Sequence, residues 1–460
     1  SDTPAYLART FGTPTSDKTW TISFWVKVCK IDSGNYSIFF AAGDFNGDQT
    51  VLSLTPADPD IKLEDYQSSS WKTQLRSDAK YRDSAAWYHI VYSYDSTPST
   101  PSASSIKIFV NGSQITSFST ETYPSQNQAT IINTAVENRI GGIPTNGDTY
   151  YFDGYMAEVV FVDGTALDAD SFGETNSDTG QWIPKAISGL TFGNNGFHLD
   201  FADSSSLGND VSGNDNDWAT SGLAAADQMT DSPTDNFCTW SPIDKDTATF
   251  ANGNLQVSSG GSGSTAGCAR ATFGMAAGKW YWEGKLTARD ATGTGVFGVI
   301  DPAVKMDDDI LDEVGAGYGT YSGRLFETDS GSSFGTTPSA DDFMQVAFDA
   351  DSGKIWFGLN NTWQASGDPA AGSNPAATLS TSISWLPCAV DNTRSQTWLC
   401  DFGQSGFNYT PPSGFEALST ANLDDPTIAD PSGSFQSTIY TGDGATTLAV
   451  NQGGNSTFTP

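Results

Sequence analysis

Apolar and polar residues alternate in short stretches along most of the chain, and clusters of turn-forming residues separate these stretches. In the clearest example, Trp20, Ile22 and Phe24 alternate with Thr21 and Ser23. A period of two places successive side chains on opposite faces of a β-strand. Further stretches with strand character lie at residues 36–41, 51–54, 87–94, 106–110 and 155–162. The pattern predicts a meandering antiparallel sandwich, because Gly, Asn, Asp and Pro cluster between these stretches.

A second region of the chain predicts a β-hairpin. Three apolar residues occupy alternate positions on each side of a turn at residues 351–353, namely Val346, Phe348 and Ala350 before it and Ile355, Phe357 and Leu359 after it. The second strand ends at Asn360 and Asn361. Helical patterns are weak, because the two strongest candidates, residues 165–173 and 306–313, span only one or two turns. We therefore predict an all-β protein with two antiparallel β-sandwiches in series and little helix.

The length of 460 residues exceeds what one hydrophobic core usually serves, so two or three domains are expected. Between residues 163 and 235 Gly, Asn, Ser and Asp dominate, but an apolar stretch at 196–201 and Trp218 argue against a flexible linker. We expect a strand that returns to the first sandwich and then a crossover. The predicted division is 1–185 for the first sandwich, 186–235 for strand and crossover, 236–420 for the second sandwich, and 421–460 for a C-terminal strand segment that begins a further module of a longer parent chain.

The formal net charge of −33, with only 21 Lys and Arg along the chain, argues against nucleic acid as a partner. Nine of the 54 acidic residues are Glu and the others are Asp, which suits turns, solubility in salty surroundings and the binding of hard cations. No apolar run approaches 18 residues, and the first residues lack the features of a signal peptide. We expect no membrane insertion.

Five cysteines occur without CxxC spacing, which argues against a zinc knuckle or a dense disulfide framework. Cys388 and Cys400 are equidistant from Arg394. A hairpin that turns at residues 391–395 would place them opposite each other, so a disulfide between them and a pair of buried thiols are both open.

Catalytic patterns are weak. Glu158 is the only acid in its strand pattern, and Glu283 has no acidic residue at i+2 or i+4, so neither strand carries the paired carboxylates of a glycosidase. The two histidines, His89 and His198, lie within strand patterns and are interpreted as structural. Motifs for phosphate, zinc or ester chemistry are missing from the sequence. We predict that the chain is not an enzyme.

Two sets of residues are candidates for binding. Asp44, Asn46 and Asp48 present alternate oxygens, as the opening of a calcium loop does, although Gln49 replaces the glycine of an EF-hand and Thr55 its closing acid. The alternatives are a rim calcium site completed by Asp148 or Asp153 and an Asx-rich turn. The candidates for stacking on sugar rings lie in loops or at strand ends and are Trp71, Tyr150, Tyr151, Tyr321 and Trp363.

The order of several motifs resembles two known families of concanavalin-like β-sandwiches. TWTISFWVK, AAWYHIVYSYD, IKIFVNG and FDGYMAEVVFVDG resemble the laminin-G-like jelly roll over residues 1 to about 170. KWYWE, the hairpin at 346–363 and GQSGFNYTPPSGF resemble, in that order, the SPRY (B30.2) domain. The resemblance implies two concanavalin-like jelly rolls, and it implies that the SPRY-like domain binds partners.

The combination of both domains around FHLDFADSSSLGNDVSGNDNDW and MTDSPTDNF resembles bacteriophage fibre and other virion surface proteins. This resemblance implies a non-enzymatic structural and adhesive protein, outside the cell on a virion, that binds host surface polysaccharide or neighbouring virion proteins. It also implies self-association, as a trimer. The alternatives are a secreted bacterial lectin or adhesin and a polysaccharide-degrading tailspike.

Overall fold

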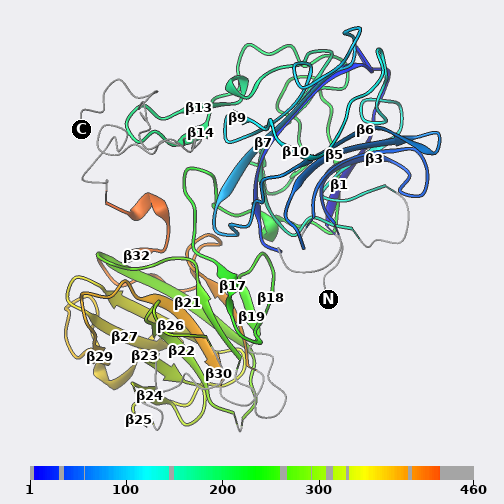
Figure 1. The fold of residues 1–460 in the computed structure, drawn as a ribbon. Helices are drawn as coiled ribbons and strands as arrows, with labels where there is room; N and C mark the ends of the chain where they lie inside the picture. Colours follow the sequence, from blue (N-terminus) through cyan, green and yellow to red (C-terminus); the bar gives the residue numbers. More distant parts are fainter. Residues whose placement is uncertain are drawn as a thin grey trace, which may run out of the picture.

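The computed structural model describes residues 5–30, 36–55, 57–144, 150–258, 267–291, 293–306, 314–327, 331–391 and 396–424. Figure 1 shows two β-rich lobes, one built from the first half of the chain and one from the second. Within the described residues the helical elements are short 3-10 turns: η1 Ala169–Ser171, η2 Ala225–Asp227, η3 Gln364–Ser366 and η4 Thr420–Asn422. None of the described helices is long and apolar enough to cross a membrane. The predicted all-β fold class is confirmed.

The first sandwich packs an eight-stranded sheet against a six-stranded sheet. The eight-stranded sheet, in spatial order, contains β10 Phe118–Thr122, β6 Ser70–Ser77, β5 Ile61–Gln67, β4 Gln49–Leu54, β3 Ser37–Gly43, β11 Glu137–Ile140, β1 Tyr6–Thr10 and β16 Ala219–Ser221. The six-stranded sheet contains β15 Phe197–Leu199, β12 Gly154–Asp163, β2 Thr19–Val28, β7 Trp87–Asp95, β8 Ile106–Val110 and β9 Ser113–Gln114. A separate pair is formed by β13 Gly173–Thr175 and β14 Trp182–Pro184.

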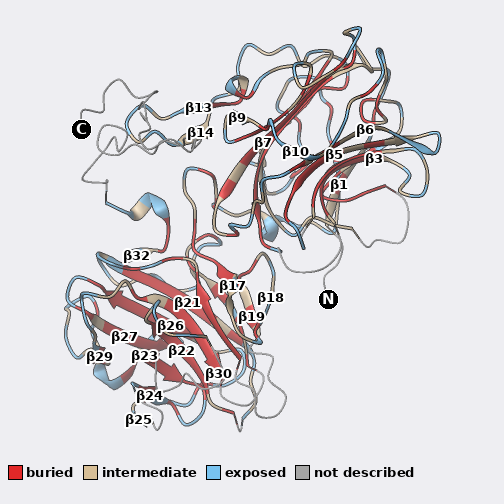
Figure 2. Ribbon diagram, in the orientation of Figure 1, coloured by how far each residue is buried: buried red, intermediate tan, exposed pale blue. Residues whose placement is uncertain are grey.

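The second sandwich packs a seven-stranded sheet against a larger one. The seven-stranded sheet contains β17 Trp240–Lys245, β20 Gly267–Ala271, β30 Leu386–Asp391, β22 Gly295–Ile300, β23 Val314–Gly319, β24 Arg324–Phe326 and β25 Ser332–Ser333. The larger sheet contains β18 Thr249–Ala251, β19 Gln256–Ser258, β31 Thr397–Asp401, β21 Lys279–Ala288, β26 Phe343–Asp349, β27 Lys354–Leu359, β28 Thr362–Trp363, β29 Ala377–Thr378 and β32 Glu416–Ala417. In Figure 2 the central strands of this sandwich are buried and its connecting loops are exposed.

The predicted hairpin at residues 346–363 is confirmed. β26 pairs with β27 in antiparallel register, with Phe348 opposite Ile355 and Val346 opposite Phe357. Asn360 and Asn361 both have positive φ and turn the chain into β28. Asparagine tolerates this left-handed conformation better than most residues, which explains why the second strand stops here.

The polar crossover between the sandwiches folds against both of them. β15 and β16, which lie within residues 186–235, add strands to the two sheets of the first sandwich. β17, at residue 240, is the first strand of the second sandwich. The helical candidate at residues 306–313 lies outside the described residues after residue 306, and the C-terminal segment 421–460 does so after residue 424.

A buried ion pair ties the crossover to the first sandwich. The Lys27 ammonium donates to the Asp231 carboxylate at 2.8 Å, to Asn236 Oδ1 at 2.8 Å and to the Phe237 carbonyl at 2.7 Å. The Trp87 indole N–H donates to the second Asp231 oxygen at 2.9 Å. The side chains of Lys27 and Asp231 are both fully buried, so every charge is matched inside the junction.

Each of the four outer sheet faces carries an apolar cluster covered by other parts of the chain. Residues 167–192 cover the six-stranded sheet of the first sandwich. In the second sandwich, Val304 and Met306 lie on the seven-stranded sheet, and residues 407–415 lie on the larger one. On the eight-stranded sheet the cluster includes Ile38 and Val51, and Tyr36, Phe45 and Tyr150 pack against it.

Candidate functional site

The outer face of the eight-stranded sheet carries a row of polar side chains. Leu52, Leu54, Ile61, Leu63 and Leu75 point into the core, so the residues between them point outward. Register then places Ser53, Lys62 and Arg76 side by side on three neighbouring strands. A second row contains Glu64 and Gln74, whose side chains are joined by a hydrogen bond of 3.1 Å. We call this surface the outer face.

Aromatic side chains lie over the same outer face. Tyr150 contacts Tyr36 and Phe45, with ring centroids 5.9 Å and 4.7 Å apart. All three rings pack on an apolar patch that includes Ile38 and Val51, and all are only partly buried. Rings with one accessible face beside hydrogen-bonding groups are the usual features of a carbohydrate-binding surface.

A second group of aromatic residues lies farther along the outer face. Tyr6 and Tyr151 stack with centroids 6.2 Å apart and an interplanar angle of 18°. The guanidinium of Arg139 lies 4.2 Å from the centroid of Tyr6 and also pairs with Glu137 at 2.6 Å. A cation over an aromatic face is attracted by the ring quadrupole, which holds Arg139 and Tyr6 in place.

Several buried polar atoms of the outer face lack hydrogen-bond partners. Among the described residues these atoms include Ser53 Oγ, Lys62 Nζ and Arg76 Nε. Lys62 is 0% exposed, and its ammonium lies 4.3 Å from the centroid of Tyr36. Burial lowers the pKa of Lys62, which Glu64 partly offsets. Such groups cost free energy when they are buried unpaired, so their position here needs an explanation other than stability.

The structure separates the aromatic candidates into two regions. Tyr150 and Tyr151 belong to the outer face. Trp71 is 44% exposed and packs edge-on against Tyr66, where β5 turns into β6. Tyr321 and Trp363 belong to the second sandwich, where Tyr321 is 46% exposed in the turn after β23 and Trp363 packs beside the cluster that contains Trp356. The five residues therefore do not form one site.

The calcium candidates form the turn between β3 and β4. Asp44 Oδ1 accepts from the Asn46 N–H at 3.0 Å, and Asp48 Oδ1 accepts from the Ser68 N–H at 2.7 Å. The first bond is that of an Asx-type turn, and the second ties this turn to the β5–β6 turn. The described residues contain no group of three or more His, Cys, Asp or Glu side chains that could hold a metal ion. Asp148, a possible fourth ligand, lies outside the described residues.

His89 is buried under two indole rings and has both ring nitrogens occupied. Trp182 Nε1–H donates to His89 Nδ1 at 2.9 Å, so His89 Nε2 carries the proton and donates to Ser23 Oγ at 2.8 Å. Desolvation lowers the His89 pKa to about 3. In this tautomer the imidazole cannot remove the Ser23 proton, so the Ser23–His89 contact is not a nucleophile–base pair.

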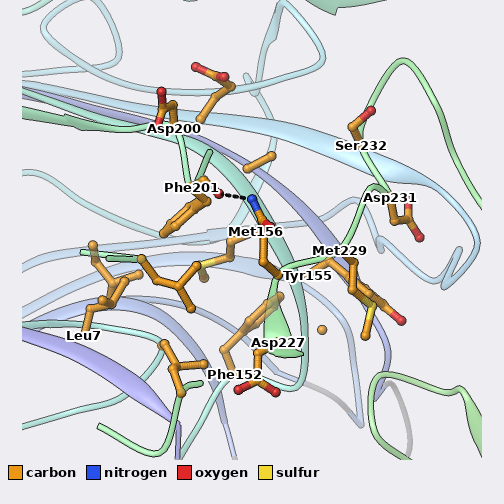
Figure 3. A pocket seen from close by; sticks show the side chains of 18 of the residues that line it. Leu7, Phe152, Tyr155, Met156, Asp200, Phe201, Asp227, Met229, Asp231 and Ser232 are labelled. Atoms are coloured by element: carbon orange, nitrogen blue, oxygen red, sulfur yellow. Dashed lines mark hydrogen bonds between the residues drawn. The ribbon is translucent and has the colours of Figure 1, made fainter. Parts of the chain in front are cut away.

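A pocket of about 560 Å³ lies between the first sandwich and the crossover. The ends of β1, β11 and β12 form part of its wall, and residues 223–234 form another part. Figure 3 shows that Leu7, Phe152, Met156 and Met229 contribute apolar surface, with Asp200 in the upper part of the view and Asp227 in the lower part. Glu158 also lines the pocket and contacts His198, with Oε2 and Nε2 2.6 Å apart. Sequence spacing missed this pair because β12 and β15 are distant in the chain.

Glu283 also has an acidic neighbour that sequence spacing missed. Asp401 lies directly opposite Glu283 on β31. Burial raises the pKa of both carboxyl groups. Glu283 accepts from the Tyr281 hydroxyl at 2.8 Å and from the Asn408 N–H, while Asp401 accepts from the Gly403 N–H at 2.7 Å. These bonds hold the segment that covers the sheet.

Cys388 and Cys400 do not lie opposite each other in a hairpin, so of the two open alternatives the pair of buried thiols holds. β30 pairs with β20 and β22 in the seven-stranded sheet, whereas β31 pairs with β19 and β21 in the facing sheet. Cys388 lies on the outer side of its sheet and Cys400 in the central core. All five cysteines lie in the described part of the chain, and they are buried thiols.

Comparisons with known proteins match only parts of the chain. Residues 3–171 match the laminin G type 3 family model, described as the concanavalin A-like lectin/glucanases superfamily. None of the curated proteins matches. Similar solved structures include the SPRY domain of human HERC1 (19% identity, 35% of this chain and 96% of that one), a human SPRY domain (15%, 33% and 94%) and the heptameric SAP-like pentraxin from Limulus polyphemus (14%, 36% and 73%). Their TM-scores are 0.27, so they carry no functional argument. The concanavalin-like assignment of the first sandwich rests on the family match.

Proposed function

We propose that this chain is a non-enzymatic adhesion protein that binds a surface glycan through the outer face of its first sandwich. The observation that carries the proposal is the mixed composition of the outer face. It combines the partly buried rings of Tyr36, Tyr150 and Tyr6 with Ser53 Oγ and Lys62 Nζ, two buried atoms that have no hydrogen-bond partner among the described residues. The first sandwich also matches a family whose description names lectins and glucanases.

The chemistry of the outer face suits a sugar. Tyrosine rings can stack on the C–H face of a pyranose, while planar and charged groups bind its hydroxyl groups. Arg139, Glu137 and Gln74 supply such groups at the edges of the aromatic clusters. Arg76 is 33% exposed and pairs with Asp60 at 3.3 Å, whereas its Nε is buried and has no hydrogen-bond partner among the described residues.

The proposal that the chain lacks hydrolase activity has geometric support. His89 holds its proton on the nitrogen that faces Ser23, and both oxygens of Glu283 accept internal hydrogen bonds. Release of reducing ends from a host polysaccharide, with loss of this activity in Glu158→Gln or Glu283→Gln, would instead favour the tailspike alternative.

The virion setting and the partners are proposed from the resemblance in module order. On this proposal the chain lies on the surface of a virion, outside the cell, and binds host polysaccharide or neighbouring virion proteins as a homotrimer. Sedimentation of the parent protein tests the oligomeric state, because a stable monomer would contradict the trimer. A gene neighbourhood of tail or capsid genes would support the virion, whereas an upstream signal peptide would support the secreted lectin.

A glycan array followed by calorimetry tests the binding face. We expect Tyr150→Ala to weaken binding about tenfold, because ring stacking and the packing of Tyr36 and Phe45 are lost together. Tyr321→Ala is the matched control, because it removes an exposed tyrosine from the second sandwich. If Tyr321→Ala weakens binding and Tyr150→Ala does not, the site lies in the second sandwich. If the wild-type protein binds no glycan, the proposal is wrong.

A further inference from the structure

The pocket beside the crossover has a composition that differs from that of the outer face. Its lining residues include Leu7, Phe152, Met156, Phe201 and Met229, but no Lys, Arg or His. Two methionines beside aromatic rings form an adaptable apolar surface. A volume of about 560 Å³ is within the range of small-molecule sites.

The charged residues of this pocket are all acidic. Glu158 and Asp200 lie near one another on two paired strands, because Val159 pairs with Leu199 and Val160 with His198. Each carboxylate has one oxygen committed, Glu158 to His198 and Asp200 to the Ala202 N–H. Asp231 differs, because both of its oxygens are used by Lys27 and Trp87 in the junction.

The third available carboxylate belongs to Asp227 in η2. Asp227 Oδ2 accepts from the Ala224 N–H at 2.6 Å, and its other oxygen has no contact among the described hydrogen bonds. Figure 3 shows Asp227 in the lower part of the view and Asp200 in the upper part, with Met156 and Tyr155 between them. A ligand in the pocket would therefore contact apolar surface in the middle and carboxylate groups above and below it.

We infer that this pocket binds an organic cation with an apolar or aromatic body and a primary or quaternary ammonium group. Charge complementarity carries the inference, because four carboxylates line the pocket, three of them outside the Lys27 ion pair, and the described lining residues include no basic side chain. An ammonium group gains from carboxylates and from the faces of Phe and Tyr rings, whereas a neutral apolar ligand leaves the carboxylates unmatched. Tyr6 lines this pocket and also belongs to the outer face, but the inference rests on the carboxylates of the pocket and does not depend on the proposed glycan binding.

Three indoles of similar shape test the inference on the wild-type protein. Calorimetry compares tryptamine, which is cationic, with the neutral tryptophol and the anionic indole-3-propionate. We expect tryptamine to bind with a Kd of about 1 mM or tighter, and indole-3-propionate to bind at least about tenfold more weakly. Equal binding of the three, or no binding of tryptamine at this level, would overturn the inference.

Variants then locate the binding. Glu158→Gln and Asp200→Asn should each weaken tryptamine binding about threefold to fivefold and leave tryptophol binding unchanged. Met156→Trp should abolish binding of both, because the larger side chain fills the pocket. Asp203→Asn, in the nearby turn outside the pocket lining, is the matched control for general attraction to an acidic protein. If Asp203→Asn weakens binding as much as Asp200→Asn does, or if Met156→Trp has no effect in a folded protein, the pocket is not the site.

Discussion

The two sandwiches differ in how they accommodate buried cations. In the second sandwich, Arg270 is 4% exposed and its guanidinium donates to the carbonyl groups of Asp301, Pro302 and Val304. In the first sandwich, Lys62 is as deeply buried, yet its ammonium has no hydrogen-bond acceptor among the described residues. Arg270 thus helps to hold the segment that covers its sheet, while Lys62 lies beneath the ring of Tyr36 on the outer face.

This difference distinguishes buried charges that stabilise the fold from a buried charge that has a functional role. An isolated buried charge is costly, and folded proteins normally pair it. Lys27, at the junction, follows the same rule as Arg270 because it is fully paired with Asp231 and its neighbours. Lys62 is therefore the exception among these three buried cations, and exceptions of this kind occur preferentially at functional sites.

The largest change in stability should come from breaking the ion pair between Lys27 and Asp231 at the junction. Lys27→Met leaves the Asp231 carboxylate buried and without its cation, so we expect a loss of about 3–5 kcal/mol in the free energy of unfolding. Urea denaturation of the wild type, Lys27→Met and the double variant Lys27→Met/Asp231→Asn measures it. The double variant should recover part of the loss, since no charge then remains unpaired. Single and double variants of equal stability would contradict this account.

The next largest effect should be a pH-dependent change in the free energy of unfolding. It comes from Asp65, on the core side of the eight-stranded sheet. Burial raises the pKa of Asp65 to about 6, although Thr50 and Gln67 donate hydrogen bonds to it. The folded state therefore binds this proton more tightly than the unfolded state does, whose pKa is about 3.8. Its contribution to stability is complete below pH about 4 and is lost as the pH rises to about 6, with a total of about 3 kcal/mol.

The comparison of Asp65→Asn with the wild type isolates this contribution. The amide remains neutral, so the difference in unfolding free energy between the two proteins should change by up to about 3 kcal/mol between pH 4 and pH 7. Other carboxylates titrate in both proteins and cancel in the difference. A difference that is constant across this range would show that Asp65 has an ordinary pKa.

A smaller effect of opposite sign should follow from Lys62→Met. The methionine keeps the packing beneath Tyr36 and removes a buried charge without an acceptor, so we expect the protein to gain about 1 kcal/mol. Arg270→Met is the contrasting variant and should lose stability, because three carbonyl groups lose their donor. Thermal unfolding measures both variants. If Lys62→Met destabilises the protein as Arg270→Met does, Lys62 is a structural residue and the contrast between the sandwiches disappears.

The sequence predicts the strands well because alternation is a local signal. Trp20, Ile22 and Phe24 lie in the core as their period of two requires, and the hairpin around residues 351–353 has the predicted register. Registers between distant strands are not encoded in any single stretch. Cys388 and Cys400 do not lie opposite each other in a hairpin because their two strands enter different sheets.

The outer face could not be found from the sequence for the same reason. Tyr6, Tyr36, Lys62, Arg139 and Tyr150 come from widely separated segments, and only the strand order β6-β5-β4-β3-β11-β1 places them on one surface. Tyr150 and Tyr151 were accessible to sequence reasoning because they are aromatic residues in a loop. Lys62 was not, because a lysine at an outward position of a strand normally indicates solvent exposure.

The smallest effect should come from calcium at the β3–β4 turn. Asp44 and Asp48 both use carboxylate oxygens to hold backbone N–H groups, and no further acidic side chain of the described residues joins them in a metal-binding group. We therefore expect calcium to raise the Tm no more than sodium chloride of equal ionic strength does, in the wild type and in Asp48→Ala alike, because screening of the −33 charge acts on both. Asp48→Ala itself should cost about 1 kcal/mol through the lost hydrogen bond to Ser68. A calcium-specific rise in Tm that disappears in Asp48→Ala would show instead that the turn binds the ion in the folded state, and its size would give the affinity by linkage.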